Sequence, residues 1–425
     1  MEEKKELKIK FKTAVIAIII VAIILVAIIA VAINNGRQEK SGGNKTIISE
    51  VNQNEQILES DFSLKFLKLE NEKQNMVYSP LSIKYALNML NEGAVGNTKT
   101  QIENVIGDLN LTKYNTIDEV LSLANSVYIK DTFAEYVKED YRRTITEKYN
   151  AEVNYDSFSN ATNINNWIED KTLGIIQNML TDETVQNANM LLINALAIDM
   201  EWKNPFDTSN TYGEDFYLAD GNTMTATMMH KETMGDDASY YKDNDITALT
   251  MDLQEYDNTQ FEFIAIMPEE NLSDYIETLT IEDVNTILEN TTLASDTQYG
   301  VDISIPKFSF DYDLQLKQDL MDLGITDAFD ENLADFSNMA NTELCVEDAL
   351  HKADIDFSEE GIRAAAVTAL TMRTNAMLPD DDQPEEIKID KPFLYFIRDK
   401  QTNEIWFVGT VYEPNSWEQD MEEYR

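Results

Sequence analysis

The sequence predicts an α+β fold, and the order of helix and strand signals along the chain carries that prediction. Helix signals concentrate in residues 56–180, whereas strand signals dominate the rest. The runs Met190–Met200, Phe261–Met267 and Phe393–Ile397 are almost wholly apolar, as strands covered on both faces are. Because the two kinds of signal are segregated, the pattern favours α+β over alternating βαβ units.

Three helices are predicted in the first of these regions. The pair Ser79-Pro80 places an N-cap before a proline at the first helical position. A capping box at Thr98–Gln101 opens a second helix, which Gly107 ends. An amphipathic helix around 57–69 precedes both, because apolar side chains recur there at intervals of about four residues.

Some of the later segments also predict their position in a sheet. Met190–Met200 is too apolar for an edge, so a central strand is expected there. Residues 404–412 follow Phe393–Ile397 after a short polar turn, which predicts a C-terminal hairpin. Cys345 lies between alternating polar and apolar neighbours, so it is expected to be a buried strand residue.

The composition limits what the protein binds. A formal net charge of −45 excludes nucleic acid as a partner, because phosphates would be repelled. One cysteine cannot form an intramolecular disulfide, and two histidines cannot make a three-histidine zinc site. No metal and no cofactor are therefore expected. An enzyme is not expected either, since no serine–histidine–aspartate ordering is visible.

The amino-terminal segment predicts a membrane anchor. Residues 14–33 are an unbroken run of 20 apolar residues, long enough to span a hydrocarbon core of about 30 Å. Lysines precede the run, which keeps residues 1–12 cytoplasmic and exports the remainder. We therefore expect a transmembrane helix over 13–33, a flexible tether over 34–55 and a single-pass protein of the cell membrane. Secretion after signal cleavage is the alternative, because Ala30–Ala32 resembles a cleavage site.

A long connection near the carboxyl terminus has no clean element of its own. It runs from Ser358 to Lys391, and connections longer than about 12–15 residues in a compact domain are usually functional or disordered. Its first half, to Met372, lacks proline, whereas the second half contains Pro379 and Pro384. Only the first half can join a sheet, because proline removes a ladder donor.

Alternation within that first half favours a strand that inserts into an existing sheet. One face is uncharged, and the other has an arginine at each end. The competing interpretation is a helix over Arg363–Met372, since alanine and leucine are strong helix formers. The uncharged face consists of Ile362, Ala364, Ala366, Thr368, Leu370 and Met372, and the other of Arg363, Ala365, Val367, Ala369, Thr371 and Arg373.

From about Gln56 to Pro414 the sequence resembles the serpin family. Asn75–Ile83 is similar to the opening helix motif of that family, and Leu191–Ala195 is similar to its central-strand motif. The expected serpin domain is 56–415, with the loop at 358–391 and a tail at 416–425. Further motifs follow in the family's order, at Ile164–Glu169, Thr172–Ile176, Trp202–Phe206, Ile305–Phe308, Leu323–Ile325, Ala349–Ala353, Lys391–Phe393 and Phe407–Gly409.

The resemblance implies a serpin fold with three β-sheets, eight to nine helices and an exposed reactive-centre loop. It also implies a monomeric, single-use peptidase inhibitor rather than an enzyme. The target peptidase cuts the loop, the loop inserts into the main sheet as an extra strand, and the acyl-linked peptidase is dragged across and distorted. The expected target is a serine endopeptidase, with a cysteine peptidase as the alternative.

The resemblance also places the hinge and the cut bond of the loop. Ile362 departs from the pattern, because inhibitory members usually have threonine or serine there, and slower insertion is expected. Counting at family spacing puts the reactive bond at Asn375–Ala376, with Arg373 and Met377 as nearby alternatives. The hinge residues are Glu359, Glu360, Gly361, Ile362, Ala364, Ala365 and Ala366.

Two polar groups align with conformational clusters of the family. The shutter cluster lies beneath the point where the main sheet parts, and the breach cluster lies where the loop enters it. For each, a satisfied core residue or a surface ion pair is the competing interpretation. The shutter residues are Ser79, Ser82, Asn194 and His351, and the breach residues are Trp202, Lys307 and Glu359.

Two functions remain open at this point. The leading hypothesis is inhibition of an extracytoplasmic serine endopeptidase by loop cleavage and insertion. The alternative is a non-inhibitory serpin that serves as a cell-surface binding module. Ile362 is the feature that favours the alternative, because slow insertion lets a peptidase complete hydrolysis.

Overall fold

The computed structural model describes most of the folded domain and none of the three segments predicted at the amino terminus. It describes residues 61–107, 111–362, 383–418 and 420. The predicted cytoplasmic segment 1–12, transmembrane helix 13–33 and tether 34–55 lie outside these residues. Within the described ranges, no helix is both long and apolar enough to cross a membrane.

Nine α-helices lie within the described residues, as the expected eight to nine require. They are α2 (Asp61–Leu69), α3 (Pro80–Gly93), α4 (Gly96–Ile106), α5 (Glu139–Tyr149), α6 (Thr162–Lys171), α7 (Asp182–Asn187), α8 (Leu272–Thr278), α9 (Ile281–Glu289) and α10 (Leu316–Asp322).

Strands supply the rest of the framework. They are β1 (Met76–Tyr78), β2 (Leu121–Lys130), β3 (Glu152–Asp156), β4 (Met190–Ile198), β5 (Met200–Glu201), β6 (Thr211–Tyr217), β7 (Thr223–Thr233), β8 (Ala238–Lys242), β9 (Ile246–Tyr256), β10 (Thr259–Pro268), β11 (Thr292–Leu293), β12 (Val301–Pro306), β13 (Phe308–Gln315), β14 (Leu350–Phe357), β15 (Gly361–Ile362), β16 (Glu385–Lys388), β17 (Phe393–Asp399) and β18 (Ile405–Val411).

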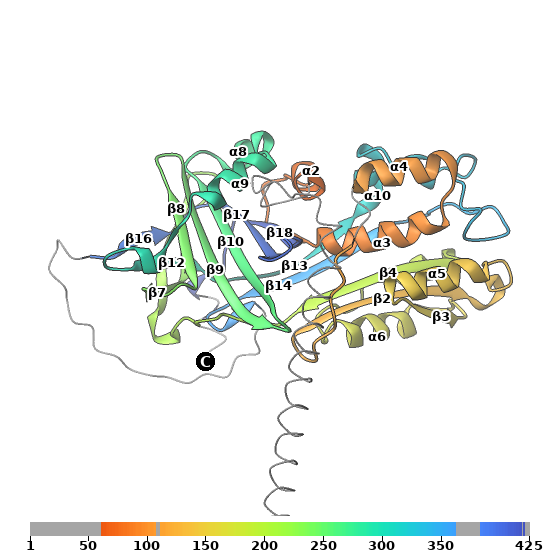
Figure 1. Cartoon of the computed structure of the whole chain (residues 1–425), viewed down its shortest axis with the longest axis horizontal. Coiled ribbons are helices and arrows are strands. Elements are labelled where there is room, and N and C mark those ends of the chain that lie inside the picture. The colour runs from red at the N-terminus through yellow and green to blue at the C-terminus, as the bar shows by residue number, and fades with distance from the viewer. Residues whose placement is uncertain (1–60, 108–110, 363–382, 419, 421–425) are drawn as a thin grey trace, which may run out of the picture. The chain divides into compact units, whose positions relative to one another are not determined.

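The described strands form four hydrogen-bonded sheets (Figure 1). The largest has the order β1-β18-β17-β10-β9-β8-β11. Two four-stranded sheets have the orders β16-β12-β7-β6 and β13-β14-β15-β5, and a three-stranded sheet has the order β3-β2-β4. β17 and β18 pair antiparallel, as the predicted C-terminal hairpin requires.

The expected main sheet is divided between β4 and β14. β4 runs on through Asp199 into β5, so the three-stranded sheet and the β13-β14-β15-β5 sheet meet along one stretch of chain. No pairing joins β4 to β14 in the part of the chain that the structure describes, and β15 bridges β14 and β5 at one end only. The hydrogen-bonded sheets therefore number four rather than three, because the main sheet is parted.

β4 is an edge strand and not the central strand that its apolar sequence predicts. It pairs with β2 alone, from Leu121↔Ile198 to Ile129↔Met190. Its faces are nevertheless covered on both sides, by α3 on one and α6 on the other (Figure 1). The apolar sequence therefore reports that the faces of the strand are buried, and it carries no information about the pairing of its edges.

The seven-stranded sheet supplies the other half of the core. One of its faces, which carries Ile264 and Ile266, packs on α2, α8 and α9. The opposite face carries Phe263 and Leu249 and packs against the β16-β12-β7-β6 sheet and against Phe308 of β13. The hinge end of the parted main sheet therefore rests on a continuous apolar layer.

Local sequence signals were right for α3 and wrong at two other points. Ser79 caps α3, and its hydroxyl accepts a hydrogen bond from the N–H of Ser82 at 3.1 Å. The predicted capping box at Thr98 is wrong, because α4 starts before it and the buried Thr98 hydroxyl accepts from the N–H of Asp335 instead. Cys345 is partly exposed in an irregular segment, so the strand prediction there is wrong too.

Candidate functional site

The parted main sheet encloses a cavity of about 640 Å³ between β4 and β14. α3 lines one side of it, the segment 176–190 with α7 lines another, and the irregular segment 343–349 lies at one end. Both flanking strands turn an unpaired edge toward the cavity. Each edge therefore offers backbone N–H and C=O groups to an additional extended strand.

The hinge already occupies the first position of this cavity. Gly361 and Ile362 form β15, which lies between the two edges. Ile362 pairs with Phe357 of β14 on one side and with Met200 of β5 on the other. The start of the predicted loop is thus built into the main sheet as a short antiparallel strand.

The Ile362 side chain is 2% exposed and is buried in the apolar core. The apolar pocket around it includes Leu196, Ile198 and Ile355, which belong to the same core cluster and line one small hollow together with Ile362. Burial of such a side chain stabilises the docked hinge by roughly 1.5–3 kcal/mol. The slower insertion expected from Ile362 stays a prediction, but the docked hinge shows that a β-branched apolar residue fits this position.

Gly361 is required by space rather than by an unusual backbone angle. A Cβ at this position would overlap the carbonyl oxygen of Met200 and would lie 2.7 Å from the Cα of Glu201. Because backbone atoms cannot swing aside as a flexible side chain can, any larger residue at 361 conflicts with the pairing of β15 to β5.

Trp202 holds the chain just before the hinge. Its backbone N–H donates to the carbonyl of Glu360 at 2.9 Å, and its indole N–H donates to the carbonyl of Ser358 at 2.9 Å. The N–H of Phe206 donates to the carbonyl of Glu359 at 2.8 Å. Three consecutive carbonyls, those of Ser358, Glu359 and Glu360, therefore have donors from one short segment.

A buried ion pair completes the breach cluster. The Lys307 ammonium lies 3.0 Å from a carboxylate oxygen of Glu359, and both side chains are mostly buried. Trp202, Lys307 and Glu359 are thus brought to one place, as the family alignment expects. A buried pair of this kind fixes position more than it adds stability, because desolvation offsets most of the attraction.

Three of the four shutter residues also meet. The N–H of Ser79 donates to Nε2 of His351 at 3.0 Å, and Ser82 bonds to Ser79 in turn. Burial lowers the pKa of His351 to about 4, so the imidazole is neutral and Nε2 remains an acceptor. These bonds tie β14 to the start of α3.

Asn194 lies on the other flank of the cavity and joins a different network. Its amide donates to Oδ1 of Asn125 at 2.8 Å, and Asn125 donates to the carbonyl of Tyr149 at 2.9 Å. The carbonyl oxygen of the Asn194 side chain has no hydrogen-bond partner among the described residues. The cavity therefore separates Asn194 from His351. Asn125 belongs to this network and was not predicted from the sequence, because it lies in no recognisable motif.

Most of the reactive-centre loop lies outside the described residues. The chain is described again from Gln383, and β16 then pairs in parallel with β12. The two ends of the loop are therefore held by two different sheets. The predicted loop residues outside the description are Ala364, Ala365, Ala366, Arg373, Asn375, Ala376 and Met377.

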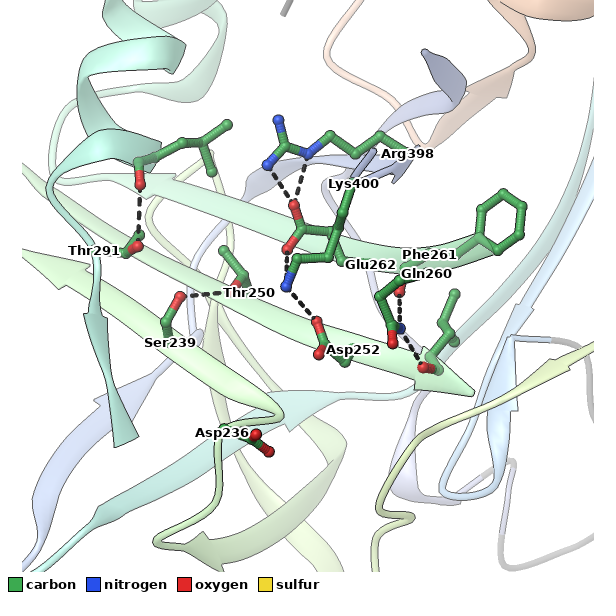
Figure 2. A network of polar contacts seen from close by, with 12 residues as sticks. Asp236, Ser239, Thr250, Asp252, Gln260, Phe261, Glu262, Thr291, Arg398 and Lys400 are labelled. Carbon is green, nitrogen blue, oxygen red and sulfur yellow. Dashed lines mark hydrogen bonds and ion pairs between the residues drawn. The ribbon is translucent and has the colours of Figure 1, made fainter. Parts of the chain in front are cut away.

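A network of buried charges, which the sequence reasoning missed, crosses the seven-stranded sheet (Figure 2). Nε of Arg398 donates to Glu262 at 2.6 Å, and Lys400 lies 2.7 Å from Asp252 and 3.4 Å from Glu262. Burial raises the pKa of Asp252, although Lys400 acts in the opposite direction. No motif could reveal this network, because Arg398 and Lys400 are more than 130 residues from Glu262 and Asp252 in the sequence and meet them only in the folded sheet.

The chemistry of the site suits a peptide strand. Its flanks present backbone donors and acceptors, and its floor is apolar. Within the described residues, no group of three or more histidine, cysteine, aspartate or glutamate side chains is arranged to hold a metal ion.

Comparison with known proteins gives one consistent match. A sequence model of the serpin (serine protease inhibitor) family matches residues 58–414. The chain is 30% identical to an uncharacterised serpin-like protein of Methanosarcina mazei, over 80% of this chain and 82% of that protein. It is 27% identical to plasminogen activator inhibitor 1 of Sus scrofa, over 84% of this chain and 92% of that protein. The native-state crystal structure of the thermophilic serpin tengpin matches with a TM-score of 0.69 and 30% identity, over 83% and 92% of the two chains.

Alanine in place of Gly361 is expected to expel the hinge from the main sheet. The added Cβ overlaps the Met200 carbonyl, so β15 cannot form and Ile362 leaves its pocket. The native protein should lose roughly 2–3 kcal/mol of unfolding free energy. Urea unfolding measures that loss, and the rate of trypsin cleavage after Arg363 should rise.

A Ser358→Ala variant is the control for this experiment. Within the described residues, its hydroxyl donates one long hydrogen bond, at 3.4 Å, to the carbonyl of Gly361. It should therefore leave both the unfolding free energy and the cleavage rate close to those of the unchanged protein. Equal behaviour of the Gly361→Ala and Ser358→Ala variants would contradict the steric argument.

His351 is expected to make stability depend on pH. Its folded pKa of about 4 lies below the ordinary value of 6.5, so the unfolded chain binds the proton more readily between those values. The contribution is fully present above about pH 6.5 and is lost as the pH falls toward 4, to a total of about 3 kcal/mol. Urea unfolding at several pH values measures it. A His351→Gln variant should lack this fall in unfolding free energy between pH 6.5 and 4. If the unfolding free energy of the variant and of the unchanged protein falls equally with pH, the assignment to His351 is wrong.

Proposed function

The chain belongs to the serpin family, and from this premise we propose that it inhibits an extracytoplasmic serine endopeptidase as a single-use trap. Members of the family are typically protease inhibitors rather than enzymes. The observation that carries the proposal is the open strand position between β4 and β14, with the hinge docked at its first residue pair.

The pairing register supports the length of the strand that would insert. Ile362 faces Met200, and each step forward along the loop is one step back along β5 and β4, because the strands are antiparallel. Continuing that register brings Met372 opposite Met190, which is the first residue of β4. The sequence places the end of the insertable half of the loop at Met372.

The side-chain alternation supports the same insertion. Ile362 points into the core, so residues at even numbers would follow it inward. Those residues run from Ala364 to Met372 and are all uncharged. The two arginines, at 363 and 373, fall on the opposite face. The strand could therefore enter the sheet without burying a charge under it.

The trap follows from how the loop is held. The serine hydroxyl of the peptidase attacks the scissile carbonyl, the peptide bond breaks and the new amino terminus leaves with the β16 side of the chain. An ester then joins the peptidase to the upstream part of the loop, which is free to fill the cavity. Strand insertion moves the ester with it, and distortion of the peptidase active site slows hydrolysis.

The reactive bond is proposed at Asn375–Ala376, with Arg373 and Met377 as neighbouring alternatives. Residue types set the expected target. Asn375 would suit an asparagine-directed enzyme. Arg373 would suit a trypsin-like or clostripain-like peptidase, whereas Ala376, Met377 or Leu378 would suit an elastase-like or subtilisin-like one. A cysteine peptidase remains an alternative target.

We place this domain, as a monomer, outside the cell membrane, anchored by the apolar residues 14–33. The support is the length of that run and the lysines that precede it. Secretion after cleavage of the run is the alternative. Peptidase added to intact cells distinguishes the two, because an anchored inhibitor forms its complex on the cells rather than in the medium.

A panel of serine peptidases tests the inhibitory proposal. At least one is expected to give a covalent complex that survives SDS, and the released fragment should begin at Ala376 by mass spectrometry. Filling the cavity adds about ten strand residues at about 1 kcal/mol of net hydrogen bonding each, so the product should be more stable by on the order of 10 kcal/mol. Differential scanning calorimetry checks this through a raised melting temperature.

The control is the same peptidase with its nucleophilic serine replaced by alanine, which can bind but cannot form an ester. It should yield no covalent complex. If every active peptidase cuts the loop and none remains attached, the protein is a substrate and the inhibitory proposal is wrong.

The alternative function is a non-inhibitory serpin that acts as a cell-surface binding module, and Ile362 is the residue that favours it. An Ile362→Thr variant separates the two functions. Because slower insertion is expected from Ile362, threonine should raise the ratio of complex to cleaved product only if the speed of insertion is limiting. If the unchanged protein forms no covalent complex and the Ile362→Thr variant does, Ile362 prevents trapping in the unchanged protein. That result would favour the binding module.

A further inference from the structure

A short clip, Trp202–Phe206, connects the hinge to the seven-stranded sheet. On the hinge side, Trp202 and Phe206 donate backbone hydrogen bonds to the carbonyls of Glu360 and Glu359 at 2.9 and 2.8 Å. On the sheet side, the N–H of Lys203 donates to the carbonyl of Asp252 at 2.9 Å. The clip is therefore hydrogen-bonded to β9 and to the hinge, so a shift of the clip relative to β9 also shifts its hydrogen bonds to the hinge carbonyls.

The Lys203 side chain strengthens the sheet side of the clip. Its ammonium lies 3.4 Å from Oδ2 of Asp252 and 3.3 Å from Oδ1 of Asp236. Asp252 is therefore contacted by both the N–H and the ammonium of the same lysine. The Asp252 side chain is 8% exposed, so its carboxylate depends on protein partners more than on water.

The carboxylate that receives Lys203 is itself fixed by the network in Figure 2. Lys400 bridges Asp252 on β9 to Glu262 on β10, and Arg398 on β17 contacts the other oxygen of Glu262. Charges of opposite sign thus alternate from Lys203 to Arg398 across three neighbouring strands. We call these five residues the charge ladder: Lys203, Asp252, Lys400, Glu262 and Arg398.

The burial of the ladder argues for a positioning role. Glu262 is 3% exposed and Arg398 is 7% exposed. Buried ion pairs are often no more stabilising than apolar residues of the same size, yet they permit only one geometry. The buried Glu262–Arg398 pair holds one end of the ladder, and the partly exposed Lys400 and Lys203 connect it through Asp252 to the clip. The ladder thereby helps to fix where Trp202 stands, and Trp202 donates to the hinge carbonyls.

We propose that Lys203 is a positioning residue for the hinge, and that the charge ladder holds the Trp202–Phe206 clip in the place from which the loop enters the main sheet. The consequence for trapping rests on the proposed function. The holding of the hinge does not, because it is a property of the uncleaved protein.

Hydrogen exchange of the Trp202 and Phe206 amides, followed by NMR on the uncleaved domain, tests the proposal. Lys203→Met removes the ammonium and keeps the backbone N–H. Because the Lys203 side chain is 36% exposed, its pairs contribute less than about 1 kcal/mol, so both amides should exchange about two- to fivefold faster. Asp252→Asn keeps the backbone carbonyl and removes the charge, and it should have the same effect.

Lys388→Met is the matched control. Lys388 is 31% exposed and lies 2.7 Å from Glu214 on the β16-β12-β7-β6 sheet, and within the described residues no hydrogen bond or ion pair joins either of the two to the clip. It should leave the Trp202 and Phe206 amides unchanged. Unchanged exchange in Lys203→Met, or the same acceleration in Lys388→Met, would overturn the proposal.

A second readout separates this inference from the inhibitory one. If the unchanged protein forms a covalent complex, Lys203→Met should lower the ratio of complex to cleaved product while the rate of loop cleavage stays the same. If no complex forms with any peptidase, the inhibitory proposal fails alone, because hydrogen exchange still decides whether the ladder holds the hinge.

Discussion

β4 and β14 face each other across a cavity with backbone groups that neither strand satisfies on the other. Unpaired backbone donors and acceptors inside a protein raise its free energy, and a strand added between these edges would pair with both. The covering of β4 by α3 and α6 keeps the position shaped for a strand. The docked hinge, the split shutter cluster and the long loop all make sense as parts of a sheet that has not yet been completed.

The two ends of the loop are held in ways that suit this incomplete sheet. The upstream end is fixed at one residue pair, where Gly361 allows close approach and Ile362 is buried among apolar side chains. The downstream end continues into β16, which pairs with β12 in a different sheet. In the proposed mechanism, both ends of the intact loop are anchored, one in β15 and the other in β16 beside β12. Cleavage removes that constraint at a single step.

The sequence correctly predicted features that depend on neighbouring residues, and features that the order of serpin motifs implies. Ser79 as the cap of α3, the β17–β18 hairpin and the helix count follow from short-range signals and motifs. It failed where a neighbour distant in the chain decides. Thr98 caps no helix because Asp335 uses its hydroxyl, and the apolar sequence of β4 cannot show that one of its edges is free. The charge ladder was invisible for the same reason, because its partners meet only in the folded sheet.

The burial of Ile362 also restricts what can drive insertion. Its side chain is already in the core before any cleavage, so its transfer from water contributes equally to the uncleaved and inserted forms. The difference in free energy must then come from the residues beyond the hinge and from the backbone pairs that they add along β4 and β14. A hinge residue with a strong preference for the pocket therefore sets the starting register. In the proposed insertion, the uncharged even-numbered residues from Ala364 to Met372 would supply the driving force.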